Sequence, residues 1–141
     1  MMQKQIGHVA LFLASVITIS VATASSDYRC TIERLSLAAG DSGDVYEFQK
    51  KHYVGKQFTI ERSSGLMAGA LKNSYVTEPQ VIDLGSKENA YKVVTTMRLD
   101  QGAGAGSNIY GLTVSEHEQG DKKPFVFLAN DAVYFGNCEH F

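Results

Sequence analysis

Two cysteines, Cys30 and Cys138, lie near opposite ends of the 141-residue chain, and they are its only cysteines. In an oxidising compartment such a pair persists as a disulfide. The bond would make the first and last strands neighbours, as in a closed barrel or a sandwich. For a loop of about 100 residues the chain-entropy model gives about 4.7 kcal/mol, an upper figure because strain and residual structure reduce it. The spacing is not that of a CxxC metal or redox pair, so we predict a structural Cys30–Cys138 disulfide.

The N-terminal segment predicts export. One lysine precedes an uncharged apolar run from Val9 to Ala22, and small side chains then stand at the third and first positions before a cut after Ala24. A membrane anchor is the alternative, but a span needs about 20 apolar residues and this run is shorter and holds three hydroxyl side chains. We therefore predict that residues 1–24 are a cleaved signal peptide and that the protein is periplasmic or secreted.

Composition narrows the class of the mature chain. Hydrophobic residues make up 44% and charged residues 20% of the sequence, which is typical of a globular protein and excludes an intrinsically disordered one. The formal net charge of -2 provides no bulk attraction to nucleic acid or to anionic lipid. We expect residues 25–141 to form a single β domain with no membrane span and no nucleic-acid partner.

Short runs of alternating apolar and polar side chains, separated by turn signals, fill most of the remaining chain. Eight such runs are predicted as strands, around residues 28–32, 58–60, 67–71, 81–84, 91–99, 110–114, 125–128 and 133–138. A slip in the alternation near Leu35 predicts a β-bulge, and Gly69 inside a strand predicts a bulge or a close approach of backbone.

The fold class follows from these runs. The helices that a doubly wound α/β fold needs between its strands are missing, so we predict an all-β fold. It is a small antiparallel β-barrel or barrel-like sandwich of about eight strands with one short helix, its ends joined by the disulfide. The apolar side chains expected to close its core are Phe58, Ile60, Tyr91, Val93, Leu112, Val114, Phe125, Phe127, Val133 and Phe135.

The segment from Asp44 to Gly55 carries the helix signals. Asp44 with Glu47 resembles a capping box, and Gly55 is a suitable helix end. The segment also mixes aromatic and basic side chains, and two interpretations stay open. Its aromatics pack on the sheet while its lysines stay solvated, or the mixture docks an acidic or carbohydrate partner. The possible partner-binding patch is Tyr46, Lys50, Lys51, His52, Tyr53 and Lys56.

A glycine-rich stretch that contains Gly102, Gly104 and Gly106 resembles a phosphate cradle. Such a cradle opens a helix and uses a lysine, whereas here a strand is predicted to follow and no lysine stands at the required spacing. We interpret these glycines as a possible flexible loop between strands, of the kind that contacts partners at the mouths of barrels.

No catalytic constellation is evident. The stretch Glu116-His117-Glu118 resembles a metal cluster, but on a strand the two carboxylates would face away from His117. His140 lies in the C-terminal tail, where we expect it to be solvated, and no GxSxG nucleophile elbow is present. We predict no catalytic residue, no metal site and no cofactor.

In size, export segment and cysteine placement the chain is similar to the periplasmic lysozyme inhibitors, which are small barrels with a disulfide joining early and late segments. The resemblance implies a barrel scaffold and an inhibitor-type role. Those inhibitors carry a Ser-Gly segment before a tyrosine, whereas Ser64-Gly65 is followed by no tyrosine before Tyr75, so no inhibitory residue is carried over.

These observations predict a non-enzymatic protein that engages an unidentified protein or envelope partner through its loops or one face of its sheet. A first alternative is a carrier that holds a small apolar ligand inside the barrel. A second is a hydrolase, which would require polar residues to converge in a cleft.

Overall fold

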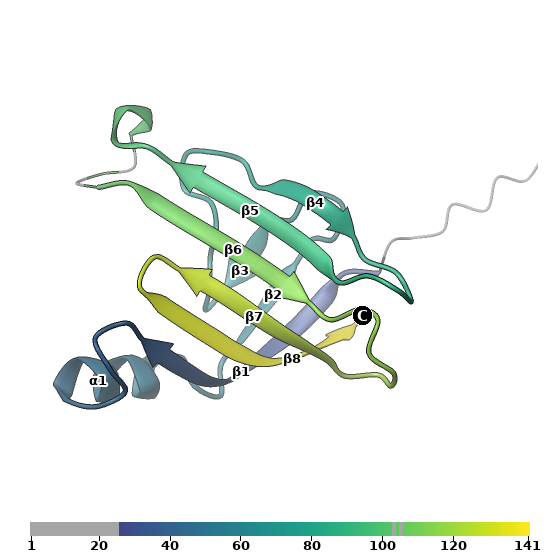
Figure 1. The fold of residues 1–141 in the computed structure, drawn as a ribbon, viewed down its shortest axis with the longest axis horizontal. Coiled ribbons are helices and arrows are strands. Elements are labelled where there is room, and N and C mark those ends of the chain that lie inside the picture. Colours follow the sequence, from purple (N-terminus) through teal and green to yellow (C-terminus); the bar gives the residue numbers. More distant parts are fainter. Residues whose placement is uncertain (1–25, 103, 105) are drawn as a thin grey trace, which may run out of the picture.

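The computed structural model describes residues 26–102, 104 and 106–141, so the predicted signal peptide and its cleavage site lie outside the described residues. Eight antiparallel strands form one sheet that curls into a half-barrel, in the order β3-β2-β1-β8-β7-β6-β5-β4, with one α-helix at its end (Figure 1). The all-β, barrel-like prediction is confirmed. The elements are β1 (Tyr28–Leu37), α1 (Asp44–Tyr53), β2 (Gln57–Ile60), β3 (Met67–Gly69), β4 (Gln80–Leu84), β5 (Tyr91–Met97), the 3-10 turn η1 (Leu99–Gln101), β6 (Asn108–Val114), β7 (Lys123–Ala129) and β8 (Ala132–His140).

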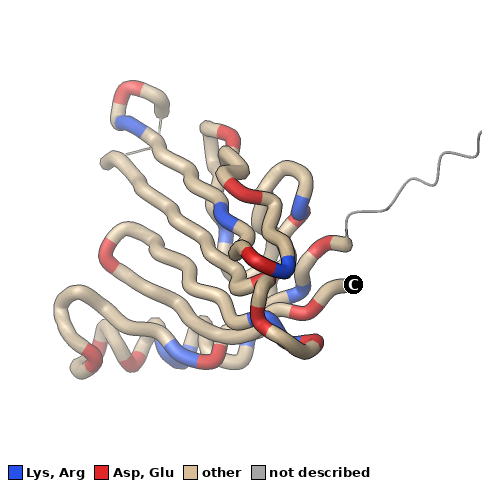
Figure 2. The backbone as a smooth tube through the Cα atoms, turned by 45° about the vertical axis from the view of Figure 1, so that its right-hand side comes forward, with Lys and Arg blue, Asp and Glu red and all other residues tan. Residues whose placement is uncertain are grey.

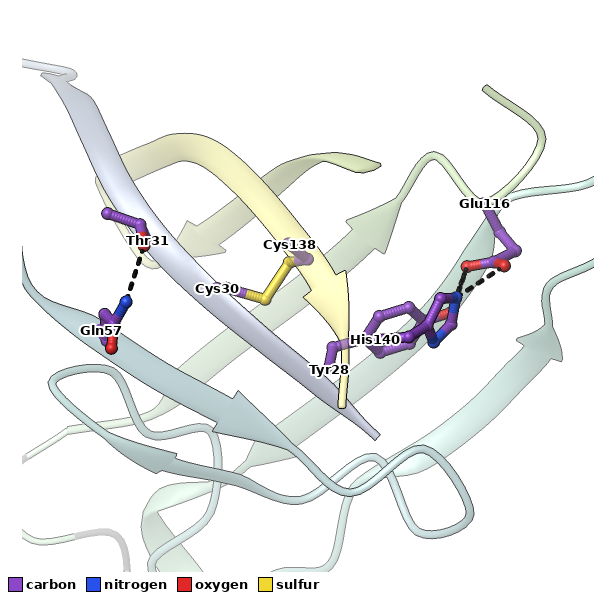
Figure 3. Close-up of a disulfide and its surroundings, with 7 residues drawn as sticks. All are labelled: Tyr28, Cys30, Thr31, Gln57, Glu116, Cys138 and His140. Carbon is purple, nitrogen blue, oxygen red and sulfur yellow. Dashed lines mark hydrogen bonds and ion pairs between the residues drawn. A yellow bond between two sulfur atoms is a disulfide. The ribbon is translucent and has the colours of Figure 1, made fainter. Parts of the chain in front are cut away.

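The first and last strands are neighbours at the centre of the sheet. β1 pairs with β8 along its length, and Cys30 stands directly opposite Cys138. Their sulfur atoms form the predicted disulfide, and both residues are buried (Figure 3). A disulfide of this kind suits an oxidising, extracytoplasmic environment.

The concave face of the sheet holds a core of aromatic and aliphatic side chains. Tyr28, Phe58, Tyr91 and Phe127 are among its largest fully buried members. Most of the predicted core is confirmed: the buried residues include Phe58, Ile60, Tyr91, Val93, Leu112, Val114, Phe125 and Phe127.

The prediction is wrong for Val133 and Phe135, which are only half-buried. The inward side of β8 is the other one, with Ala132, Tyr134 and Cys138 buried. Phe135 lies on the outer face, where the Arg34 guanidinium carbon stands 3.6 Å from its ring centroid.

Two irregularities fall close to where the alternation predicted them, whereas the register shift of β4 against β5 between Val81 and Asp83 was not predicted. The register of β1 against β8 shifts between Ile32 and Arg34, which is a bulge. At Gly69 the φ angle is 119°, and a Cβ atom there would lie 2.9 Å from the Phe58 Cα atom. Close backbone approach therefore requires this glycine. The strand predicted to reach Leu99 instead ends at Met97, and Leu99 is exposed in η1.

Side chains cap the two edges of the half-barrel, β3 and β4. The buried Asn73 amide accepts from the Met67 N–H at 3.0 Å and donates to the Gly65 carbonyl at 2.8 Å, as a neighbouring strand would. On the β4 side, the Arg62 guanidinium donates to the Leu84 carbonyl at 2.7 and 3.0 Å. These bonds protect strand ends that would otherwise offer free backbone groups.

None of the helices in the described part of the chain is both long enough and apolar enough to cross a membrane.

Candidate functional site

Helix α1 forms at the predicted place but begins differently from the prediction. Gly43 is the N-cap residue and makes no side-chain cap, so the capping-box prediction is wrong; the Glu47 N–H bonds to the Gly43 carbonyl instead. The predicted end is confirmed, because Gly55 takes a positive φ of 84° directly after the C-cap residue. Acidic residues occupy the first turn of the helix and basic residues the last turn, and charges placed in this way interact favourably with the helix dipole (Figure 2).

A groove of about 590 Å³ separates α1 from the hairpin of β7 and β8. The helix stands at the end of the sheet where β1 finishes, so it overhangs that end rather than covering the sheet (Figure 1). We call this feature the α1 groove. Its lining comes from both elements: Asp44, Val45, Phe48, Gln49, His52 and Tyr53 from α1, and Ala129, Asp131, Ala132 and Tyr134 from the hairpin.

Apolar side chains on α1 face this groove without being buried by the fold. Val45 is 67% and Phe48 is 69% exposed. The Phe48 ring stacks on the His52 ring with 6.0 Å between centroids. Large exposed apolar side chains beside a concavity mark interaction surfaces in proteins of this size.

An aromatic and polar chain of contacts fixes the floor of the groove. The Tyr53 ring meets the Tyr134 ring edge-on at 5.1 Å, and His52 meets Tyr53 in the same way at 4.7 Å. The Tyr134 hydroxyl donates to the Gln49 side-chain oxygen at 3.1 Å. Burial raises the pKa of Tyr134 to about 12, so this hydroxyl stays protonated at neutral pH. The helix is thereby held at a fixed distance from the hairpin.

Two carboxylates border the groove. Asp44 belongs to α1 and Asp131 to the turn between β7 and β8. Within the described residues, neither carboxylate makes an ion pair or a side-chain hydrogen bond. The groove therefore combines an apolar wall with negative charge that the fold does not neutralise.

The six residues predicted as a binding patch lie on α1 or directly after it, and only some of them line the α1 groove. His52 and Tyr53 line the α1 groove. Tyr46 is half-buried against the core, and the Lys50 ammonium lies 5.7 Å from its ring centroid. Lys51 and Lys56 are exposed and do not line the groove. The predicted patch therefore divides into two parts: solvated lysines outside the groove, and His52 and Tyr53 in one wall of the groove.

Sequence reasoning missed Val45 and Phe48 on the α1 wall of the groove, and the whole wall that the β7–β8 hairpin forms. Val45, Phe48 and His52 follow each other at helical spacing, and that signal was present in the sequence. Asp131 and Tyr134 gave no signal, because only the tertiary fold brings the β7–β8 hairpin to the helix.

The glycine-rich loop between β5 and β6 leaves Gly102, Gly104 and Gly106 exposed. Gly102 takes the left-handed conformation with a φ of 83° at the end of η1. The predicted strand, β6, follows at Asn108, so these glycines do not open a helix onto an anion.

A second cluster lies at the opposite end of the β1–β8 pair. We call it the terminal clasp and define it by Ser26, Tyr28, Glu116 and His140 (Figure 3 shows all but Ser26). The Tyr28 hydroxyl donates to Glu116 Oε2 at 2.7 Å, and His140 Nε2 lies 2.9 and 3.1 Å from the two Glu116 carboxylate oxygens. His140 Nδ1 lies 2.8 Å from Ser26 Oγ.

The prediction that His140 is a solvated tail residue is wrong. Its side chain is 29% exposed and its ring lies 4.7 Å from the Tyr28 ring. The stretch from Glu116 to Glu118 is a turn, so the alternation of a strand does not decide where its side chains point. Glu116 points to His140, while His117 Nε2 stands 3.8 Å from the Glu118 carboxylate on the surface.

Competing effects set the charge of Glu116. Burial by itself would raise the pKa of its carboxyl, but hydrogen bonds from Tyr28 and His140, together with the positive charges of His140 and Arg62, bring the pKa below its ordinary value of 4.5. Burial, followed by the bond to Glu116, raises the pKa of the Tyr28 phenol. At neutral pH the clasp therefore holds an ionised carboxylate and a protonated phenol. Among the described residues no group of three or more His, Cys, Asp or Glu is placed to hold a metal ion.

Comparison of the chain with protein-family models, with curated proteins and with solved structures finds no match.

Proposed function

We propose that this protein is a non-enzymatic binding protein of the periplasm or the extracellular space that engages a protein partner through the α1 groove. The observation that carries the proposal is the exposure of Val45 and Phe48 beside a groove of about 590 Å³. An apolar ring that is left 69% exposed gains little stability from the fold. An apolar side chain of the partner would bury Phe48 in the interface and so contribute to binding.

The charges of the groove define the partner further. Asp44 and Asp131 border the apolar wall and meet no cation in the described part of the chain. A partner segment that places a lysine or arginine beside its apolar anchor satisfies both features. The proposed occupant is therefore a basic and apolar protein segment, which favours a protein over a carbohydrate or an anionic envelope polymer.

The filled core argues against the carrier alternative. The half-barrel encloses fully buried tyrosines and phenylalanines at the position where a carried molecule would lie. The α1 groove lies outside this core, between the helix and a hairpin. The geometry consequently supports recognition at the surface.

The test is a capture experiment with matched variants. The exported protein, purified with its disulfide intact, carries a photo-crosslinker at Val45 and is exposed to envelope and extracellular extracts. Phe48→Glu is the disruptive variant, and Ile82→Glu is the control because Ile82 is 63% exposed on β4, away from the groove. We expect one crosslinked partner with wild type and with Ile82→Glu, and at least a tenfold loss with Phe48→Glu. Equal capture by both variants, or no partner at all, would contradict the proposal.

A further inference from the structure

In the terminal clasp, hydrogen bonds link three side chains in a row: the hydroxyl of Ser26, the imidazole of His140 and the carboxylate of Glu116. Ser26 Oγ lies 2.8 Å from His140 Nδ1, and the Nε2 atom of the same ring lies 2.9 and 3.1 Å from the Glu116 oxygens. Distances of this size join nucleophile, base and orienting carboxylate in enzymes that use covalent catalysis. Ser26 precedes β1, Glu116 lies in the turn after β6, and His140 is the last residue of β8.

His140 Nδ1 lies 2.8 Å from Ser26 Oγ and 3.4 Å from the Ser26 backbone carbonyl oxygen, and the direction of the row of hydrogen bonds follows for the neutral imidazole. An ionised carboxylate can only accept hydrogen bonds, so Nε2 of a neutral His140 carries the hydrogen and Nδ1 presents its lone pair. The Ser26 hydroxyl is then the donor to Nδ1. This arrangement allows the imidazole to take the hydroxyl proton, and Glu116 stabilises the imidazolium that results. In the serine-protease triad the two ring nitrogens have the opposite roles, but the sequence of donors and acceptors is the same.

The surroundings hold the base, and Ser26 itself is only partly buried. The Tyr28 ring packs against the imidazole, and its hydroxyl fixes the second oxygen of Glu116. The Glu116 side chain is 15% exposed, whereas Ser26 is only half-buried at the edge of the cluster. A preorganised pair of base and carboxylate beside a hydroxyl is the arrangement of an activated nucleophile.

We propose that Ser26 is an acyl-acceptor site, with His140 as its base and Glu116 as the residue that positions the base. The ligand class is an activated ester. A bond forms from Ser26 Oγ to the carbonyl carbon as the hydroxyl proton moves to Nδ1. The bond from that carbon to the leaving oxygen breaks, and His140 returns the proton to the leaving oxygen. The proposal concerns a single transfer to Ser26 without turnover, and it is independent of the α1 groove.

The experiment uses the exported protein with a biotin-linked alkyl fluorophosphonate, followed by peptide mass spectrometry. With this probe the Oγ–phosphorus bond forms, fluoride leaves and the hydroxyl proton passes to His140. Ser64→Ala is the matched control, because the Ser64 hydroxyl donates to the Glu61 carboxylate with no histidine between them. We expect labelling at Ser26 in wild type and in Ser64→Ala, and at least a 100-fold lower rate in Ser26→Ala.

Two further variants separate chemistry from structure. His140→Gln should lower the labelling rate at least 100-fold, and Glu116→Gln about tenfold, while near-ultraviolet circular dichroism shows the native signal. Release of p-nitrophenolate from p-nitrophenyl acetate should show a burst of one equivalent that Ser26→Ala abolishes. An unlabelled wild type, or equal labelling of Ser26→Ala and wild type, overturns the proposal. If His140→Gln unfolds, the pair of Ser26→Ala and Ser64→Ala still decides the question.

Discussion

The two ends of the β1–β8 pair are built in opposite ways. Where β1 begins and β8 ends, the Cys30–Cys138 disulfide and the terminal clasp join the chain ends with buried and hydrogen-bonded groups. Where β1 ends and β8 begins, α1 leaves Val45 and Phe48 exposed beside the α1 groove. The same two strands therefore have one end whose side chains are bonded or buried within the fold, which we call the satisfied end. At their other end, which we call the unsatisfied end, apolar side chains stay exposed and the acidic side chains of the groove have no ion-pair partner in the described residues.

This difference separates stability from recognition. Groups that have found partners inside the fold contribute to its free energy of unfolding, and removing them costs stability. Groups without partners contribute little to folding and are available to another molecule. Substitutions of the disulfide, of Tyr28 and of Glu116 should therefore lower stability, whereas substitutions of Val45 and Phe48 should act on partner binding.

The largest expected effect is at the satisfied end. Replacing both cysteines with alanine should lower the free energy of unfolding by about 2–5 kcal/mol, because the unfolded chain loses a constraint that closes a long loop. Denaturant unfolding of the double variant against the oxidised protein measures this difference. Reduced wild type should reproduce the loss, and a change below about 1 kcal/mol would show that the strand pairing holds the ends without the bond.

A smaller loss should follow from Tyr28→Phe. This change removes the hydroxyl that donates to Glu116 at 2.7 Å and leaves the buried ring in place. A hydrogen bond to a charged group contributes about 1.5–3 kcal/mol, and this is the expected loss by urea unfolding at neutral pH. Tyr75→Phe is the matched control, since Tyr75 is 67% exposed and should change stability by less than about 0.5 kcal/mol. Equal losses of stability in the two variants would show that the hydroxyl of Tyr28 contributes no more to the fold than an exposed hydroxyl does.

Acid should weaken the same end through Glu116. The pKa of its carboxyl is lower in the folded protein than its ordinary value of 4.5, so its contribution is complete above pH 4.5 and is lost as the pH falls through the folded value. Each unit of such a depression is worth about 1.4 kcal/mol. Urea midpoints should therefore fall more steeply below pH 4.5 in wild type than in Glu116→Gln. Parallel curves for the two proteins would show that Glu116 titrates as it does in the unfolded chain.

The sequence predicted the satisfied end only in part. Two isolated cysteines in a chain with a predicted export segment sufficed to predict the disulfide and the adjacency of β1 and β8. The position of His140 could not be predicted, because its partner Glu116 lies on a turn that alternation rules do not cover. For β8, the apolar Val133 and Phe135 predict the wrong inward face, because Cys138, buried in its disulfide, places the even-numbered positions inward.

The unsatisfied end was harder to predict for a different reason. The mixture of aromatic and basic residues in the α1 segment left two interpretations open, packing on the sheet or binding a partner, and the structure places the groove beside this helix. The lysines of α1 carry little information about binding, because an exposed lysine is an ordinary surface residue. The informative residues are an exposed phenylalanine and two carboxylates without cations, and their surroundings can be read only from the fold.

The smallest expected effect is at Phe48, and it is the sharpest test of the comparison. Because Phe48 is 69% exposed, Phe48→Ser removes little buried apolar area and should change the free energy of unfolding by no more than about 0.5 kcal/mol. Phe127→Ser, at a side chain that is 1% exposed, should cost several kcal/mol by the same measurement, since it opens a cavity and buries a hydroxyl in the core. A loss of about 2 kcal/mol or more in Phe48→Ser would mean that the ring supports the fold through its stack on His52. Phe48 would then belong with the satisfied groups, and the α1 groove would lose the residue that marks it as a binding surface.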